Sequence, residues 1–122
     1  MSSVLELTKL LKNGVGGDFH PLFFPAESED SGSQVEITSG GQVVGGKGDM
    51  NVQIITRDVH PAYAESKSLE IRSFLNDGTG FSLGELQIIL VKAESLFPFY
   101  LGTDDNGRHL FSENYKFIMG VL

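Results

Sequence analysis

Three histidines and one acidic segment are the residues of this chain whose types suggest chemistry. His20, His60 and His109 lie far apart, and none has a partner at the spacing that a helix or hairpin metal site requires. Residues 104–107 (DDNG) are similar in composition to a calcium loop but lack its alternating ligands and terminal glutamate. We interpret the histidines as surface or capping residues and the acidic segment as a turn.

The overall composition limits the classes of function that remain. The chain has no cysteine, which excludes disulfides, thiol nucleophiles and cysteine-ligated zinc. A formal net charge of −7 disfavours nucleic-acid binding through phosphate neutralisation, which requires clustered lysine and arginine. No apolar run approaches the roughly 20 residues of a membrane helix. We therefore predict a single soluble domain over residues 1–122 that is not an enzyme and holds no cofactor or metal.

Two helices must position the remaining elements. Apolar residues at helical spacing predict a helix over residues 3–13, opened by a capping box and closed by an Asn-Gly pair. His60-Pro61 opens the second helix, because proline is preferred at the first helical position, and residues 76–78 end it. The predicted inner face of the second helix carries Ala64, Ser68, Ile71 and Leu75.

Residues 34–38 and 50–56 alternate between apolar and polar side chains and predict two strands. In the second strand, Met50, Val52 and Ile54 are expected to face the core. The opposite face is expected to carry Asn51, Gln53, Ile55 and Arg57. Because that face is not uniformly polar, we expect another element or subunit to cover it.

The region around the first of these strands is rich in glycine and small acidic residues. Residues 20–25, with a proline near either end, predict a short extended segment that packs its phenylalanines. Residues 26–33 predict an exposed acidic loop. Residues 39–49 predict either a glycine-rich hairpin tip or a segment that a partner orders. We treat residues 26–49 as a flexible segment of the domain.

The richest strand-forming material lies in the C-terminal third. Residues 86–93 and 110–119 are rich in β-branched and aromatic side chains. Between them, Asn106-Gly107 favours the positive φ angles of a type I′ turn. We predict a long two-stranded ribbon at the centre of the sheet. The fold class is therefore α+β: a mostly antiparallel, mixed sheet with two helices on one face and a long C-terminal β-ribbon.

Phe97, Phe99 and Tyr100 crowd around Pro98, and two interpretations of them stay open. Aromatic side chains are usually buried, so two of the three would belong to the core. Aromatic side chains are also enriched at interfaces, so they would instead contact a subunit or partner.

Residues 96–108, followed by Phe111 and residues 115–117, resemble the closing segment of the small tail terminator or minor capsid proteins of long-tailed bacteriophages. The order of a short helix, an extended piece, a strand and a second helix is similar as well. The resemblance implies a mixed α/β fold and a hexameric ring that caps the tail tube and offers the surface for head-tail joining.

The same resemblance implies a set of partners. These are further copies of this chain, the major tail tube protein and a head-completion or connector protein, in the tail or neck of a virion assembled in the host cytoplasm. The acidic region 26–49 would order on the tube or connector, and an acidic lining would let DNA pass without specific binding. No membrane is involved. The candidate interaction residues are Phe97, Phe99, Tyr100, Asp104, Asp105, Arg108, Asn51, Gln53, Ile55 and Arg57.

Other functions fit the same residues. Within the virion, a head-completion or stopper protein is the nearest alternative. Outside it, a small acidic immunity or inhibitor protein would bind a basic partner, with steep salt dependence of association. An enzyme with an unrecognised site is the third alternative, although no cluster of convergent polar residues stands out.

Overall fold

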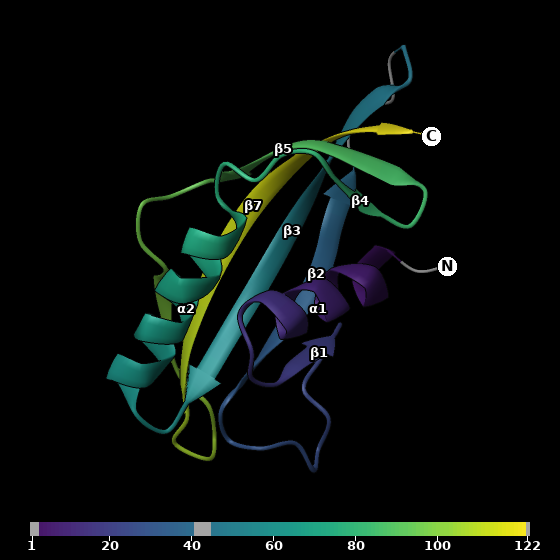
Figure 1. Ribbon diagram of the computed structural model, residues 1–122. Helices are drawn as coiled ribbons and strands as arrows, with labels where there is room; N and C mark the ends of the chain where they lie inside the picture. The colour runs from purple at the N-terminus through teal and green to yellow at the C-terminus, as the bar shows by residue number, and fades with distance from the viewer. Residues whose placement is uncertain (1–2, 41–44, 122) are drawn as a thin grey trace.

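Two helices lie on one face of a curved seven-stranded sheet (Figure 1). The computed structural model describes residues 3–40 and 45–121. In chain order the elements are α1 (Ser3–Gly14), β1 (Phe19–Pro21), β2 (Gly32–Gly40), β3 (Lys47–Asp58), α2 (Pro61–Leu75), β4 (Phe81–Leu83), β5 (Leu86–Ala93), β6 (Phe99–Thr103) and β7 (His109–Val121). None of the helices in these two ranges is long and apolar enough to cross a membrane.

The longest strand, β7, organises the sheet. The strand order is β1-β2-β3-β7-β5-β4, and β6 also pairs with β7. β1 and β2 are parallel, whereas every other neighbouring pair is antiparallel. This arrangement confirms the predicted α+β class, with a mixed, mostly antiparallel sheet and both helices on one face.

The register sets β1 and β6 at the same level of the sheet, on opposite edges. One continuous row of paired residues crosses five strands: His20, Gln34, Ile55, Ser112 and Phe99. At this level the sheet is therefore β1-β2-β3-β7-β6.

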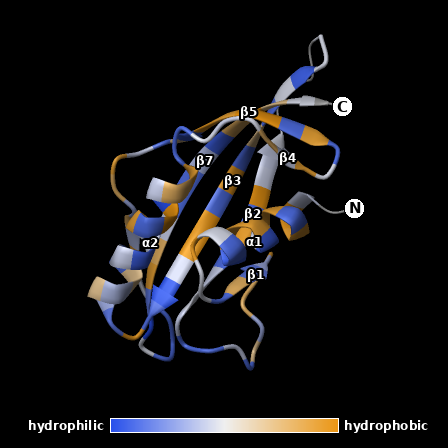
Figure 2. Ribbon diagram, in the orientation of Figure 1, coloured by the Kyte–Doolittle hydropathy of each residue, from blue (hydrophilic) through white to orange (hydrophobic). Residues whose placement is uncertain are grey.

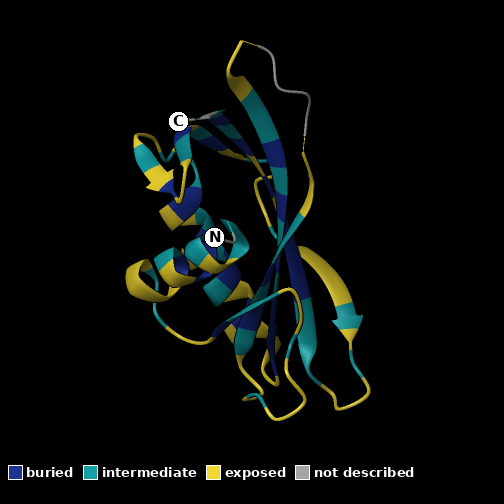
Figure 3. Ribbon diagram, turned by 90° about the vertical axis from the view of Figure 1, so that its right-hand side faces the viewer, coloured by how far each residue is buried: buried dark blue, intermediate teal, exposed yellow. Residues whose placement is uncertain are grey.

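The core fills the space between the helices and the sheet, where the buried residues gather (Figure 3). Hydrophilic and hydrophobic residues alternate along β3 (Figure 2), because only one face of that strand is covered by helices. The expected inner residues of β3, Met50, Val52 and Ile54, are buried. The predicted inner face of α2 is buried as well.

The C-terminal ribbon is more complex than the sequence predicts. β7 pairs with β5 through its C-terminal half and with β6 through its N-terminal half. The connection between β6 and β7 is not a type I′ turn, because only Gly107 has positive φ (75°) and Asn106 does not. The reason is the Asp104 carboxylate, whose Oδ1 accepts hydrogen bonds from the amides of Asn106 (2.9 Å) and Arg108 (3.0 Å) and holds a longer loop.

Gly107→Val is expected to destabilise the protein by about 1–3 kcal/mol, because a β-branched side chain resists positive φ. A Cβ at this position meets no atom within 4 Å, so the cost comes from the backbone rather than from a clash. The check is chemical denaturation beside Asp105→Ala, a change at an exposed position of the same turn. Equal stabilities of the two variants would contradict the prediction.

The glycine-rich region has defined structure on both sides of its middle. Residues 32–40 form β2, and β3 begins at Lys47. Residues 41–44, part of the segment expected to be a hairpin tip or a partner-ordered arm, lie outside the described residues.

Candidate interaction surface

The β5–β6 connection and β6 carry a cluster of exposed apolar side chains. Leu96, Phe97 and Phe99 are 73%, 72% and 69% exposed, and Tyr100 and Leu101 are about half exposed. We call Leu96, Phe97, Phe99 and Leu101 the β6 cluster. Burial in the core of this chain is therefore wrong for Phe97 and Phe99, and the interface role remains a prediction.

Tyr100 differs from its neighbours because it packs on its own hairpin. Its ring lies 5.1 Å from the ring of Phe111, and its hydroxyl is 2.8 Å from Nδ1 of His109. This tyrosine therefore supports β6 against β7 and leaves the flanking side chains directed to solvent.

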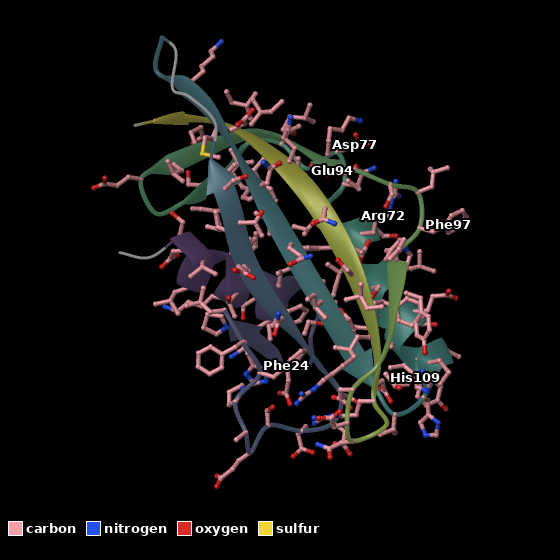
Figure 4. All side chains as sticks on the ribbon, turned by 180° about the vertical axis from the view of Figure 1, so that it is seen from behind. Phe24, Arg72, Asp77, Glu94, Phe97 and His109 are labelled. Atoms are coloured by element: carbon pink, nitrogen blue, oxygen red, sulfur yellow. The ribbon has the colours of Figure 1, made fainter. Side chains whose placement is uncertain are left out.

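Hydrogen bonds fix the connection that leads into β6. Nε of Arg72, on α2, donates to the Ser95 carbonyl (3.0 Å), and the Ser95 hydroxyl donates to the Phe97 carbonyl (2.9 Å). The Glu94 amide donates to the Asn114 carbonyl of β7 (2.9 Å). Arg72, Glu94 and Phe97 accordingly lie on the same side of the molecule (Figure 4).

Asp104 and Arg108 are joined in the turn between β6 and β7. Nε of Arg108 lies 2.8 Å from Oδ2 of Asp104, and Nη1 lies 3.5 Å from Oδ1 of Asp30 in the loop after β1. The hydrogen bond from the Arg108 amide, followed by those from the Asn106 amide and the Arg108 side chain, lowers the pKa of Asp104. These contacts tie the hairpin to residues 22–31, whereas Asp105 stays exposed.

Arg57 anchors the same loop from the sheet. Its guanidinium lies 3.8 Å from the centre of the Phe24 ring, and Nη2 donates to the Ser28 hydroxyl (2.8 Å) and the Glu29 carbonyl (3.1 Å). Burial, and next the positive charge of Arg108, lowers the pKa of Arg57. This candidate residue is therefore buried beneath the loop of its own chain.

The other candidates on β3 are half-buried on the face away from the helices. Asn51 Nδ2 donates to the Ser39 hydroxyl (2.8 Å), and Gln53 Nε2 donates to the Ser112 hydroxyl (3.2 Å). Ile55 is half-buried next to them in sequence. The candidate residues thus form two groups, one along this face of β3 and one on the β6–β7 hairpin.

Sequence reasoning missed a second exposed apolar pair, Leu22 and Phe23, directly after β1. Both are exposed, by 53% and 64%, and Leu22 has a φ of 72°. Hydrogen bonds from the Leu22 amide to the Val35 carbonyl (2.8 Å) and from the Phe23 amide to the Pro21 carbonyl (2.9 Å) hold this conformation. The expectation that both phenylalanines pack is therefore wrong for Phe23, and only the adjacent proline signalled a bend.

Glu113 is a further residue that sequence reasoning missed. It is 5% exposed on the face of β7 that α2 covers, and the Tyr115 hydroxyl donates to its Oε2 (2.9 Å). Its Oε1 has no partner in the described structure. Burial raises the pKa of Glu113 to about 7, against the hydrogen bond from Tyr115 and the charge of Arg72. A signal was present, because residue 113 stands in the alternating row of Phe111, Tyr115, Phe117 and Met119.

Residues 80–84 (GFSLG) have the G-x-S-x-G spacing of a hydrolase nucleophile turn, which sequence reasoning also missed. A nucleophile elbow needs a strand followed by a sharp turn into a helix. Ser82 instead lies within β4, which is followed by β5, and its hydroxyl donates to Oε1 of Gln87 (3.1 Å). The segment is a strand of a hairpin. Over residues 3–40 and 45–121, no three His, Cys, Asp or Glu side chains group as metal ligands.

Two comparisons with known proteins find similarity. A family model described as bacteriophage tail terminator protein matches residues 11–120. A chain in a solved structure described as the virion of a native gene transfer agent (GTA) particle has a TM-score of 0.68 with 10% identity, over 98% of this chain and 92% of that chain. At this identity the likeness shows the fold alone. No curated protein sequence matches this chain.

Proposed function

We propose, since the chain belongs to the bacteriophage tail terminator family, that it forms a hexameric ring that caps the tail tube and provides the surface for head-tail joining. Family membership makes the protein a structural component of the virion, in the tail or neck. The ring, its stoichiometry and its two partners, the major tail tube protein and a head-completion or connector protein, are our proposal.

The observation that supports the ring most directly is the β6 cluster. A monomeric soluble protein rarely exposes several large apolar side chains together, and such patches mark sites of association. Ring formation requires each subunit to offer surfaces that its neighbours can cover. The exposed cluster supplies one such surface without any rearrangement of the core.

The acidic residues suit the axial and tube-facing parts of the proposed ring. A formal charge of −7 per chain would repel passing DNA and limit its adhesion. Residues 26–49 are our candidate for the contact with the tube or connector. Assembly would take place in the host cytoplasm, and the protein would act as one domain.

A phage lysate in which this gene carries a stop codon tests the role. Negative-stain microscopy is expected to show overlong tails beside filled heads without tails. Tails of normal length beside unjoined heads would favour a head-completion or stopper role. Normal virions would contradict both roles and favour an inhibitor of a basic partner.

A further inference from the structure

Two groups of exposed apolar residues lie at the two edges of one row of strands, although other exposed apolar side chains lie elsewhere, among them Leu5 and Tyr63. The β6 cluster lies at one edge, and Leu22 and Phe23 follow β1 at the other. The row that runs from His20 to Phe99 puts the two edges at the same level of the sheet. Two different apolar surfaces on opposite sides of a subunit are what head-to-tail association uses, whereas a two-fold dimer uses the same surface twice.

The surface after β1 contains a strained backbone position, Leu22. A leucine at positive φ is uncommon and costs about 1–3 kcal/mol. The conformation directs Leu22 and Phe23 to solvent, so the cost is not offset by burial within this chain. The next residue, Phe24, is fixed over Arg57, which keeps the pair in place. Such strain at an exposed site indicates a contact with another molecule.

The β6 edge is equally open. Within the described ranges β6 pairs only with β7, so its outer edge has no strand beside it. Edge strands of monomeric proteins usually carry charged residues that prevent pairing with other chains. β6 (FYLGT) has none, and three of its five residues are exposed Phe, Tyr or Leu.

We propose that the β6 cluster of one copy of this chain packs against Leu22 and Phe23 of the next copy, so that the contact repeats head to tail. This inference rests on the ring of the proposed function and assigns the surfaces that close it. Strand directions permit the contact: β6, β7, β3 and β2 alternate in direction, and β1 is parallel to β2. The β6 edge of one copy therefore runs antiparallel to the β1 edge of the next.

Two variants block one surface each: Phe99→Asp at the β6 cluster and Phe23→Asp after β1. Both positions are exposed, so each variant is expected to have the melting temperature of the native protein when both are diluted until the native protein is monomeric. Each variant alone is expected to self-associate at least about 30-fold more weakly, the effect of losing one interface hot spot. Leu5→Asp, at an exposed apolar position on α1, is the matched control and is expected to assemble normally.

Mixing the two blocked variants separates head-to-tail contact from other arrangements. Each blocked chain keeps the surface that the other lacks, so the mixture is expected to form a complex of one copy of each, measured by native mass spectrometry. Failure to form this pair, or strong self-association of either variant alone, would overturn the inference. If the variants still form the native oligomer, the proposed contact is wrong, whereas the proposed ring is unaffected. Native protein that stays monomeric would overturn the ring and the contact together.

Discussion

Replacing Glu113 with glutamine is expected to remove a large pH dependence of stability. The pKa of Glu113 is raised from its ordinary 4.5 to about 7 in the fold, so the folded state favours the neutral acid. The contribution of Glu113 to the unfolding free energy is fully present below about pH 4.5, and it is lost as the pH rises through about 7. At about pH 8 the ionised carboxylate costs roughly 3 kcal/mol of unfolding free energy.

Glutamine is neutral at every pH and keeps an oxygen that can accept the hydrogen bond from the Tyr115 hydroxyl. The variant therefore avoids the cost of burying an ionised carboxylate. The groups that act on Glu113 are Tyr115 on its own strand and Arg72 on α2, and the favourable charge of Arg72 does not offset the burial. The unfolding free energy of the variant is expected to exceed that of the native protein by roughly 3 kcal/mol at about pH 8 and to match it near pH 4.

Urea unfolding at several pH values measures this difference. Glu94→Gln, which changes an exposed carboxylate on the β5–β6 connection, is the matched control and is expected to follow the native pH profile. Parallel profiles for the native protein and Glu113→Gln would show that the buried carboxyl does not titrate in this range.

The parts of the fold that the sequence predicted are those that local pattern determines. Alternation along β3 reports which face is buried, because successive side chains of a strand point to opposite faces. His60 and Pro61 mark the start of α2, because proline fits the first helical turn at no cost.

The parts that the sequence did not predict depend on contacts between distant segments. Arg57 reads as an exposed strand residue, and only the return of residues 22–31 across the sheet buries it. β1 is three residues long, and its pairing with β2 is set by the surrounding fold rather than by propensity. Leu22 is the clearest case, because no sequence rule places a leucine at positive φ.

Arg57→Ala is expected to release the loop at residues 22–31 and to lower the unfolding free energy by about 2–3 kcal/mol. The change removes a partly desolvated cation–π contact with Phe24 and two hydrogen bonds to Ser28 and Glu29. Burial of the Arg57 charge is itself unfavourable and lowers the pKa of Arg57. The alanine variant does not have this cost, which offsets part of the loss. Hydrogen exchange of the loop amides is expected to accelerate, while exchange in the core of β7 follows global stability.

Two further variants separate the specific contacts of Arg57 with the loop from a general effect of its charge. Arg57→Lys keeps the charge but lacks the planar guanidinium that lies over the Phe24 ring, so its stability is expected to fall between those of the native protein and the alanine variant. Lys116→Ala, at an exposed residue of β7, removes a charge without touching the loop and is expected to leave loop exchange unchanged.

Because Leu22 and Phe23 lie in the released loop, Arg57→Ala should also weaken head-to-tail association. Unchanged loop exchange in Arg57→Ala would show that the loop is held by other contacts, chiefly the ion pair between Asp30 and Arg108.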